Sequence, residues 1–106
     1  MHENIRPILE EFKTALKKLY GNKLKNIILY GSWARGKAKE HSDIDLAVLL
    51  EGEVNAGREI DRMIDIITDL QLKYNALISV YPVSEKKYMT VKNPLLLNIH
   101  KEGIPA

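Results

Sequence analysis

The sequence contains no cysteine, and only one tryptophan and one phenylalanine occur among its 106 residues. Without cysteine, the chain has no disulfide framework, no thiolate nucleophile and no cysteine-ligated metal site. No apolar run approaches the roughly 20 residues that a membrane span needs, and the first residues do not resemble a signal peptide. We therefore expect a cytoplasmic protein that does not associate with a membrane.

Strong charge of one sign is also lacking. Sixteen basic and 14 acidic residues give a formal net charge of +2. The basic residues are not clustered as densely as in nucleic-acid-binding domains, which argues against direct nucleic-acid binding. A hydrophobic fraction of 45% is ordinary for a globular protein. At this length we expect a single domain, residues 1–106, with one packed core.

Hydrophobic periodicity predicts alternating helices and strands. The expected helices cover residues 3–20, 54–73, 85–92 and 95–102, and the expected strands cover residues 25–30, 43–50 and 76–83. Away from its acidic start, the strand 43–50 is apolar on both faces, which indicates helices on at least one face of the sheet. The predicted fold class is α/β (a two-layer α+β arrangement), with a small mixed sheet of three to four strands flanked by helices.

The most informative stretch begins where the first predicted strand ends. The apolar run 26–30 is followed by Gly31 and Ser32. A glycine at that point allows a sharp turn and a close approach of the backbone to a ligand. The serine adds a hydroxyl and a backbone N–H at the same turn, which suits an anion such as phosphate.

Two aspartates follow at the start of the next strand. Asp43 and Asp45 are two residues apart, so both carboxylates project from one face. A capping role explains Asp43 alone but not the pair, which an isoleucine separates and an apolar run follows. Paired carboxylates beside a phosphate-binding turn are typical of a site that holds Mg²⁺ against a nucleotide.

An overlapping P-loop pattern is rejected. Gly31, Gly36 and Lys37 have the P-loop spacing and follow a predicted strand. Ala38 replaces the Ser or Thr whose hydroxyl would bind Mg²⁺. The segment before Asp43 is also too short for the long helix that a P-loop opens.

The whole stretch resembles the signature of a known superfamily. Gly31-Ser32, ten intervening residues and Asp43-Ile44-Asp45 are similar to the motif of the polymerase-beta-like nucleotidyltransferases. The neighbouring Ala34-Arg35-Gly36 and Ser42 narrow the resemblance to the minimal nucleotidyltransferases. Those are short single-domain proteins, many of which are antitoxins paired with HEPN-domain toxins.

This resemblance implies an activity and a set of site residues. Asp43 and Asp45 would be catalytic and would hold one or two Mg²⁺ ions, while Gly31, Ser32, Arg35 and Ser42 would contact the nucleotide. The substrate would be ATP or another nucleoside triphosphate. The expected reaction transfers a nucleoside monophosphate, AMP from ATP, to a hydroxyl on a partner HEPN toxin. The chain would thereby act as an antitoxin.

One departure from the superfamily pattern bears on activity. Most members carry a third carboxylate on the strand that corresponds to residues 76–83, where this sequence has no acid and Ser79 lies mid-strand. Two carboxylates suffice for metal binding, but the third would assist as general base. Two alternatives therefore stay open, namely an antitoxin that neutralises its partner by binding alone and a nucleotide- or RNA-binding module.

Two side chains near the motif have competing interpretations. Trp33 is expected to pack in the core rather than over the site. For Arg35, a guanidinium clamp on phosphate oxygens and an ion pair with Asp43 or Asp45 are both open.

Overall fold

The protein is built on a four-stranded mixed sheet with the strand order β3-β2-β1-β4. The computed structural model describes residues 4–39 and 41–106. Strand β2 runs parallel to β3, and β1 runs antiparallel to both β2 and β4. The strands are β1 (Leu24–Tyr30), β2 (Ile44–Leu50), β3 (Ile78–Ser84) and β4 (Ile104–Pro105). The predicted α/β class with a small mixed sheet is confirmed.

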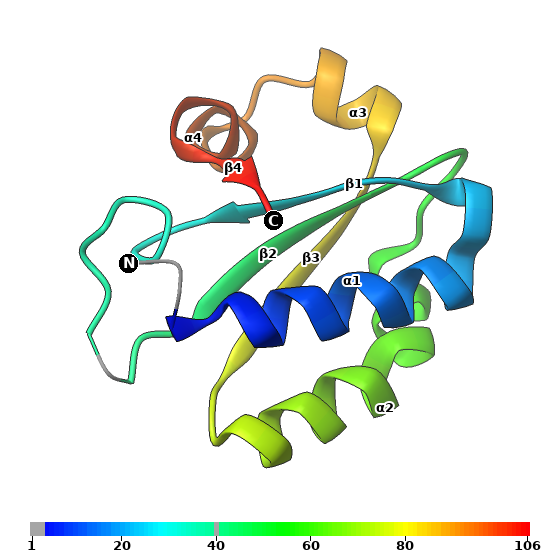
Figure 1. Ribbon diagram of the computed structural model, residues 1–106. Coiled ribbons are helices and arrows are strands. Elements are labelled where there is room, and N and C mark those ends of the chain that lie inside the picture. Colours follow the sequence, from blue (N-terminus) through cyan, green and yellow to red (C-terminus); the bar gives the residue numbers. More distant parts are fainter. Residues whose placement is uncertain (1–3, 40) are drawn as a thin grey trace.

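Helices cover both faces of the sheet, with α1 and α2 on one side and α3 and α4 on the other (Figure 1). The helices are α1 (Arg6–Tyr20), α2 (Ala56–Tyr74), α3 (Glu85–Thr90) and α4 (Pro94–Glu102), and a short 3-10 turn (Gly21–Lys23) follows α1. Each predicted element is present with shifted ends, although residue 3 of the first predicted helix lies outside the described residues. Strand β4 was not predicted. Among residues 4–39 and 41–106, no helix combines the length and the apolar character that crossing a membrane requires.

Local sequence signals explain where the helices begin. Pro7 lies in the first turn of α1, where its missing N–H costs no hydrogen bond. The side chains of Asn55, Ser84 and Asn93 accept hydrogen bonds from backbone N–H groups at the starts of α2, α3 and α4. These caps place each helix against a defined part of the sheet.

The alternation of β2 divides the core between the two faces. Ile44, Leu46, Val48 and Leu50 are buried against α1 and α2. Ala47 and Leu49 point to the other face, where they join side chains of α3 and α4. This second face has fewer buried side chains, and the polar start of β2 lies on it.

Candidate active site

The turn that follows β1 has a backbone conformation that requires glycine. Gly31 has φ +77°, and a Cβ at this position would collide with Oδ2 of Asp45. Tyr30 and Asp45 are register partners on the antiparallel strands β1 and β2. A helical turn follows, because the Arg35 N–H donates to the Gly31 carbonyl at 3.1 Å. The glycine thus lets the turn and the aspartate strand come into direct contact.

The two aspartates stand at the edge of the sheet where β2 begins. Asp43 is exposed, and Asp45 is half-buried. Burial raises the pKa of the Asp45 carboxyl, and the charge of Asp43 raises it further, against the lowering effect of Arg35. Two neighbouring carboxylates form a site that a hard cation would stabilise, so this donor set fits Mg²⁺.

The position of the missing third carboxylate is visible on β3. Ser79 is the register partner of Asp45 on the parallel strand and is exposed. Register partners of neighbouring strands point to the same face, so Ser79 flanks Asp45 where an acid would complete a triad. Within residues 4–39 and 41–106, no group of three His, Cys, Asp or Glu side chains is arranged to hold a metal. Any metal here therefore needs water or substrate oxygens as further ligands.

Arg35 pairs with an acid that the sequence analysis did not single out. Its Nη1 lies 3.1 Å and 3.0 Å from the two carboxylate oxygens of Glu102. Of the two interpretations left open for Arg35, the ion pair with Asp43 or Asp45 is therefore not formed, and the phosphate clamp stays a prediction. Glu102 also accepts a hydrogen bond of 3.1 Å from the backbone N–H of Gly31. The acid comes from the end of α4, 67 positions after Arg35, and no local pattern connects the two.

The electrostatics of the neighbouring groups follow from these contacts. Burial opposes the ionisation of Glu102, but the hydrogen bonds from Arg35 and Gly31 outweigh it and lower the pKa of this carboxyl. Burial, with the charge of Asp45 and then Tyr81, raises the pKa of Tyr30 to about 12. At neutral pH the site thus contains ionised Glu102 and a protonated phenol.

The two serines of the motif have different surroundings. Ser32 is half-buried, and its hydroxyl has no hydrogen-bond partner among residues 4–39 and 41–106. The Ser42 hydroxyl accepts from the Lys39 N–H at 2.8 Å, and the Ser42 carbonyl accepts from Trp33 Nε1 at 3.1 Å. Trp33 is buried in the core, so its predicted packing role is confirmed. The nucleotide contacts of Ser32 and Ser42 stay predictions.

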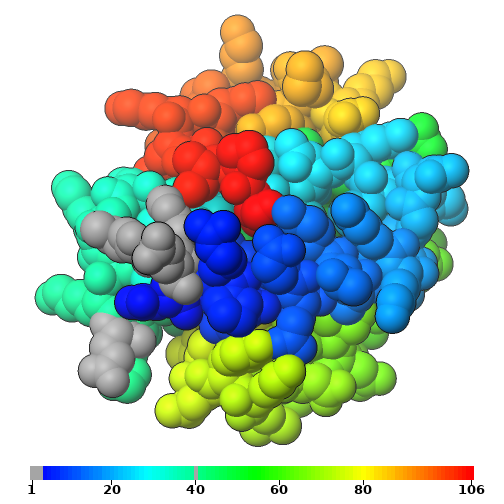
Figure 2. All heavy atoms as spheres, in the orientation of Figure 1, coloured from blue at the N-terminus to red at the C-terminus, as the bar shows by residue number. Residues whose placement is uncertain are grey.

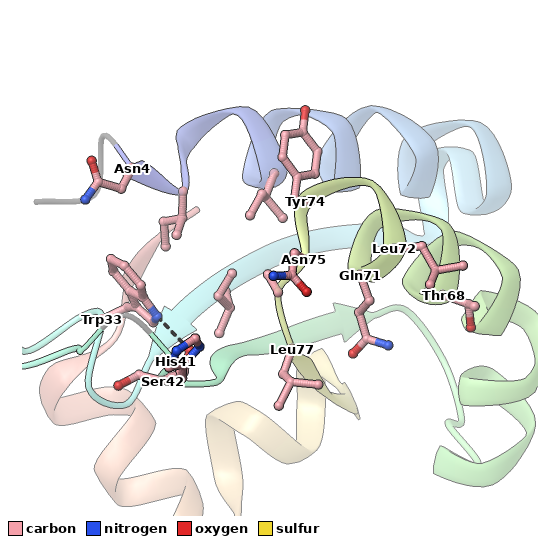
Figure 3. Close-up of a pocket in the computed structure, with 14 residues that line it drawn as sticks. Asn4, Trp33, His41, Ser42, Thr68, Gln71, Leu72, Tyr74, Asn75 and Leu77 are labelled. Carbon is pink, nitrogen blue, oxygen red and sulfur yellow. Dashed lines mark hydrogen bonds between the residues drawn. The ribbon is translucent and has the colours of Figure 1, made fainter.

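A hollow of about 660 Å³ lies on the other side of β2 (Figure 3). Trp33 stands at one end and Gln71 at the other, between the start of α1 and the end of α2. Ile44 lines the hollow, whereas the side chains of Asp43 and Asp45 alternate with it and leave on the opposite face. The hollow therefore includes neither carboxylate, and the candidate site remains at the end of the sheet where β2 begins.

A glycine-serine turn thus lies against Asp45, with Asp43 beside it, on a mixed sheet. The family model for the nucleotidyltransferase domain matches residues 9–102, a range that includes the whole motif. The chain therefore belongs to the nucleotidyltransferase domain family.

Curated relatives from Methanocaldococcus jannaschii agree with this assignment. The protein named "Putative protein adenylyltransferase MJ0604" is 41% identical over 85 residues, which are 80% of this chain and 79% of the relative. A second relative, named "Putative protein adenylyltransferase MJ0141", is 35% identical over 97 residues, which are 92% of this chain and 93% of the relative. The similarity to adenylyltransferases thus extends over almost the whole fold.

Solved structures share the fold at lower identity. A toxin-antitoxin crystal structure with AMP-PNP superposes with a TM-score of 0.63 at 20% identity, covering 91% of this chain and 70% of that chain. A structure of a tri-AMPylated Shewanella oneidensis HEPN toxin in complex with an MNT antitoxin gives a TM-score of 0.53 at 17% identity, with coverage of 92% and 69%. At these identities, the likeness establishes the fold alone.

Proposed function

We propose that this protein transfers the adenylyl group of ATP to a hydroxyl of a partner protein. The observation that carries the proposal is the contact between the Gly31 turn and the Asp45 carboxylate, with Asp43 close enough for its charge to act on Asp45. In this arrangement, groups that could donate hydrogen bonds to a phosphate lie beside carboxylates that could bind a metal. The similarity to proteins named as adenylyltransferases favours ATP over other nucleoside triphosphates.

The roles of the residues follow from their chemistry. Asp43 and Asp45 would hold Mg²⁺, which when bound neutralises charge on the triphosphate and polarises its phosphoryl groups. The Ser32 hydroxyl and the Gly31 N–H would bind the terminal phosphates, with Arg35 as a charged donor. The acceptor hydroxyl oxygen forms a bond to the α-phosphorus, the bond from that phosphorus to the β-phosphate oxygen breaks, and pyrophosphate and the hydroxyl proton are released.

Ser79 in the third-carboxylate position predicts a slow reaction. A serine hydroxyl does not accept a proton as a carboxylate does, so deprotonation of the acceptor lacks a dedicated base. Catalysis would then depend on positioning and on charge neutralisation. The same residue favours a second candidate function, an antitoxin that neutralises its partner by binding alone.

We further infer that the partner is a HEPN-type toxin and the chain its antitoxin. The structural relatives include a toxin-antitoxin crystal structure with AMP-PNP and a complex of an AMPylated HEPN toxin with an MNT antitoxin. The acceptor would be a hydroxyl of the toxin, with a tyrosine as the leading candidate.

The test is mass spectrometry of a HEPN-type protein, taken from the neighbouring reading frame where one is present, after incubation with ATP and Mg²⁺. We expect a mass increase of one or more adenylyl groups, which chelation of the metal abolishes. Asp43→Asn and Asp45→Asn should each lower the transfer by roughly 100-fold or more, because the amide lacks the charge that holds a hard cation. Asp61→Asn, which changes an exposed acid of α2, is the matched control.

The result also separates the two candidate functions. One outcome would reject the transferase function. In it, the original chain and both aspartate variants neutralise the toxin equally well, and the toxin never carries an adenylyl group. This outcome would support neutralisation by binding.

A further inference from the structure

Glu102 binds two groups that suit an anion at the candidate active site. Its carboxylate accepts from the Gly31 N–H and lies 3.0 Å from the Arg35 guanidinium. A backbone N–H in a glycine turn and a guanidinium are the donors with which proteins commonly bind phosphate. The Glu102 carboxylate thus accepts hydrogen bonds from groups of the kind that bind phosphate. Figure 2 shows the loop after β1, in teal, against the orange-red end of α4.

The position of Glu102 in its own helix is electrostatically unfavourable. It is the last residue of α4, where the partial negative charge of the helix dipole disfavours an acid. Asp45 lies nearby, because its carboxylate and that of Glu102 both approach Gly31. The contacts with Arg35 and Gly31, with a smaller contribution from the charge of Lys101, offset these repulsions. The carboxylate is thus held by groups that a stronger anion would attract.

Packing holds the backbone beside Glu102, whereas side-chain rotamers set the position of its carboxylate. A Cβ at Gly103 would collide with the Ile99 carbonyl and with Ile28, so the turn out of α4 packs directly on β1. Ile104 then pairs with Leu29 in the sheet. The Glu102 side chain has rotatable bonds of its own, so a change of rotamer would move its carboxylate without requiring a movement of α4 or β4.

We propose that Glu102 is a resident anion that occupies the place of a nucleotide phosphate on Gly31 and Arg35, and that binding of the nucleotide displaces it. This inference rests on the proposed function, because it assumes that these two groups receive a phosphate. Glu102 then lowers the affinity for nucleotide, since part of the binding free energy is used to displace it. It also keeps Arg35 and the turn in their binding positions while no nucleotide is present.

The test is a titration of the isotope-labelled chain followed by nuclear magnetic resonance. Inorganic pyrophosphate without metal, and ATP with Mg²⁺, are the two probes. In the unmodified chain, each probe should shift the Gly31 amide, the Arg35 guanidinium and the Glu102 side-chain carboxyl resonance together. This arm needs no variant, so it is independent of any effect of substitution on folding.

Variants then measure the competition. Glu102→Ala and Glu102→Gln should bind pyrophosphate roughly tenfold more tightly, because no carboxylate competes for the two donors. Glu51→Gln is the matched control, since Glu51 is also paired with a cation, Lys25 at 3.4 Å, but at the other end of β2. It should leave the affinity unchanged.

Three results would overturn the proposal. They are weaker binding in the Glu102 variants, equal binding in all variants, and a Glu102 carboxyl resonance that does not respond to either probe. Adenylyl transfer without these shifts would leave the proposed function in place and remove the inference. Displacement of Glu102 by pyrophosphate without any adenylyl transfer to a partner would keep the inference about Glu102 and remove the proposed transferase function.

Discussion

The two faces of the sheet use the same strands for different purposes. On the α1 and α2 face, β2 contributes four side chains that are at most 3% exposed, and these pack with the fully buried Phe12, Leu16 and Met63. On the α3 and α4 face, the same strand contributes Asp45, Ala47 and Leu49, and the smaller core cluster begins only after the aspartate. One face is apolar along the whole of β2, and the other is apolar along only part of it.

This difference shows how a small domain accommodates a polar site. We call the α1 and α2 face the complete face, because it is apolar along the whole of β2, and the α3 and α4 face the incomplete face. The complete face supplies most of the apolar burial, which is the main favourable contribution to folding. The incomplete face leaves room at the start of β2 for Asp43, Asp45 and the Gly31 turn. Substitutions on the first face should therefore alter stability, and substitutions on the second should alter ligand binding and chemistry.

The largest expected effect is on the complete face. Phe12→Ala removes a fully buried ring and leaves a cavity, which should lower the free energy of unfolding by about 3–5 kcal/mol. Leu72→Ala, at a side chain that is 78% exposed, should change it by less than about 0.5 kcal/mol. Urea unfolding monitored by circular dichroism measures both. Equal losses in the two variants would contradict the assignment of Phe12 to the core of this face.

A smaller effect is expected for the hydroxyl at the incomplete face. Ser32→Ala should weaken nucleotide binding by about 1 kcal/mol, rising toward 3 kcal/mol because the acceptor is charged. Calorimetric titration with ATP and Mg²⁺ measures the loss. Ser84→Ala removes a hydroxyl that caps α3 away from the site, so it should cost stability and spare binding. Unchanged affinity in Ser32→Ala would mean that this serine only shapes the turn.

A gain of activity is expected on β3. Ser79→Asp places a carboxylate in register with Asp45 and supplies the missing base, which should raise the transfer rate roughly tenfold. Ser79→Asn has nearly the same size without the basic group and should leave the rate as it was. Initial rates of adenylyl transfer distinguish the two variants. A slower Ser79→Asp enzyme would show that the third carboxylate has no place in this site.

The smallest effect is on the pH dependence of stability without metal. Because the pKa of Asp45 is raised in the folded state, the folded protein binds this proton more tightly than the unfolded chain. The contribution of Asp45 to stability is therefore largest at low pH and falls as the pH rises above about 4. Asp45→Asn removes this decline, so its stability relative to the unmodified chain should increase between pH 4 and pH 7.

Unfolding at several pH values in the presence of a chelator checks this prediction. Asp61→Asn, at an exposed position of α2, should show no such trend. A relative stability of Asp45→Asn that falls with pH would reverse the sign and contradict the burial argument.

Local patterns were sufficient to predict most of the fold and the centre of the site. Helical periodicity and strand-like apolar runs identify α1 to α4 and β1 to β3, because each element buries a stripe or a face. The Gly31-Ser32 turn and the aspartate pair were recognisable because their spacing is short. The contact between Gly31 and Asp45 then follows from the pairing of β1 with β2.

Long-range contacts were beyond the reach of local patterns. The partner of Arg35 is Glu102, and nothing near either residue indicates the other. The two-residue strand β4 was missed because it is too short to show periodicity, and it forms only where Ile104 reaches β1. The Arg35–Glu102 pair and strand β4 lie on either side of the turn at Gly103. That turn packs closely on Ile28, a contact that the residues next to Gly103 in the sequence do not indicate.

The hydrogen bond between the indole of Trp33 and the Ser42 carbonyl has a practical consequence. Trp33 is the only tryptophan of the chain and lies two residues after Gly31, while Ser42 directly precedes Asp43. Excited at wavelengths that the five tyrosines do not absorb, its fluorescence therefore reports on the loop that joins the turn to the aspartates. Emission wavelength and quenching give a label-free optical signal for any ligand that rearranges this loop.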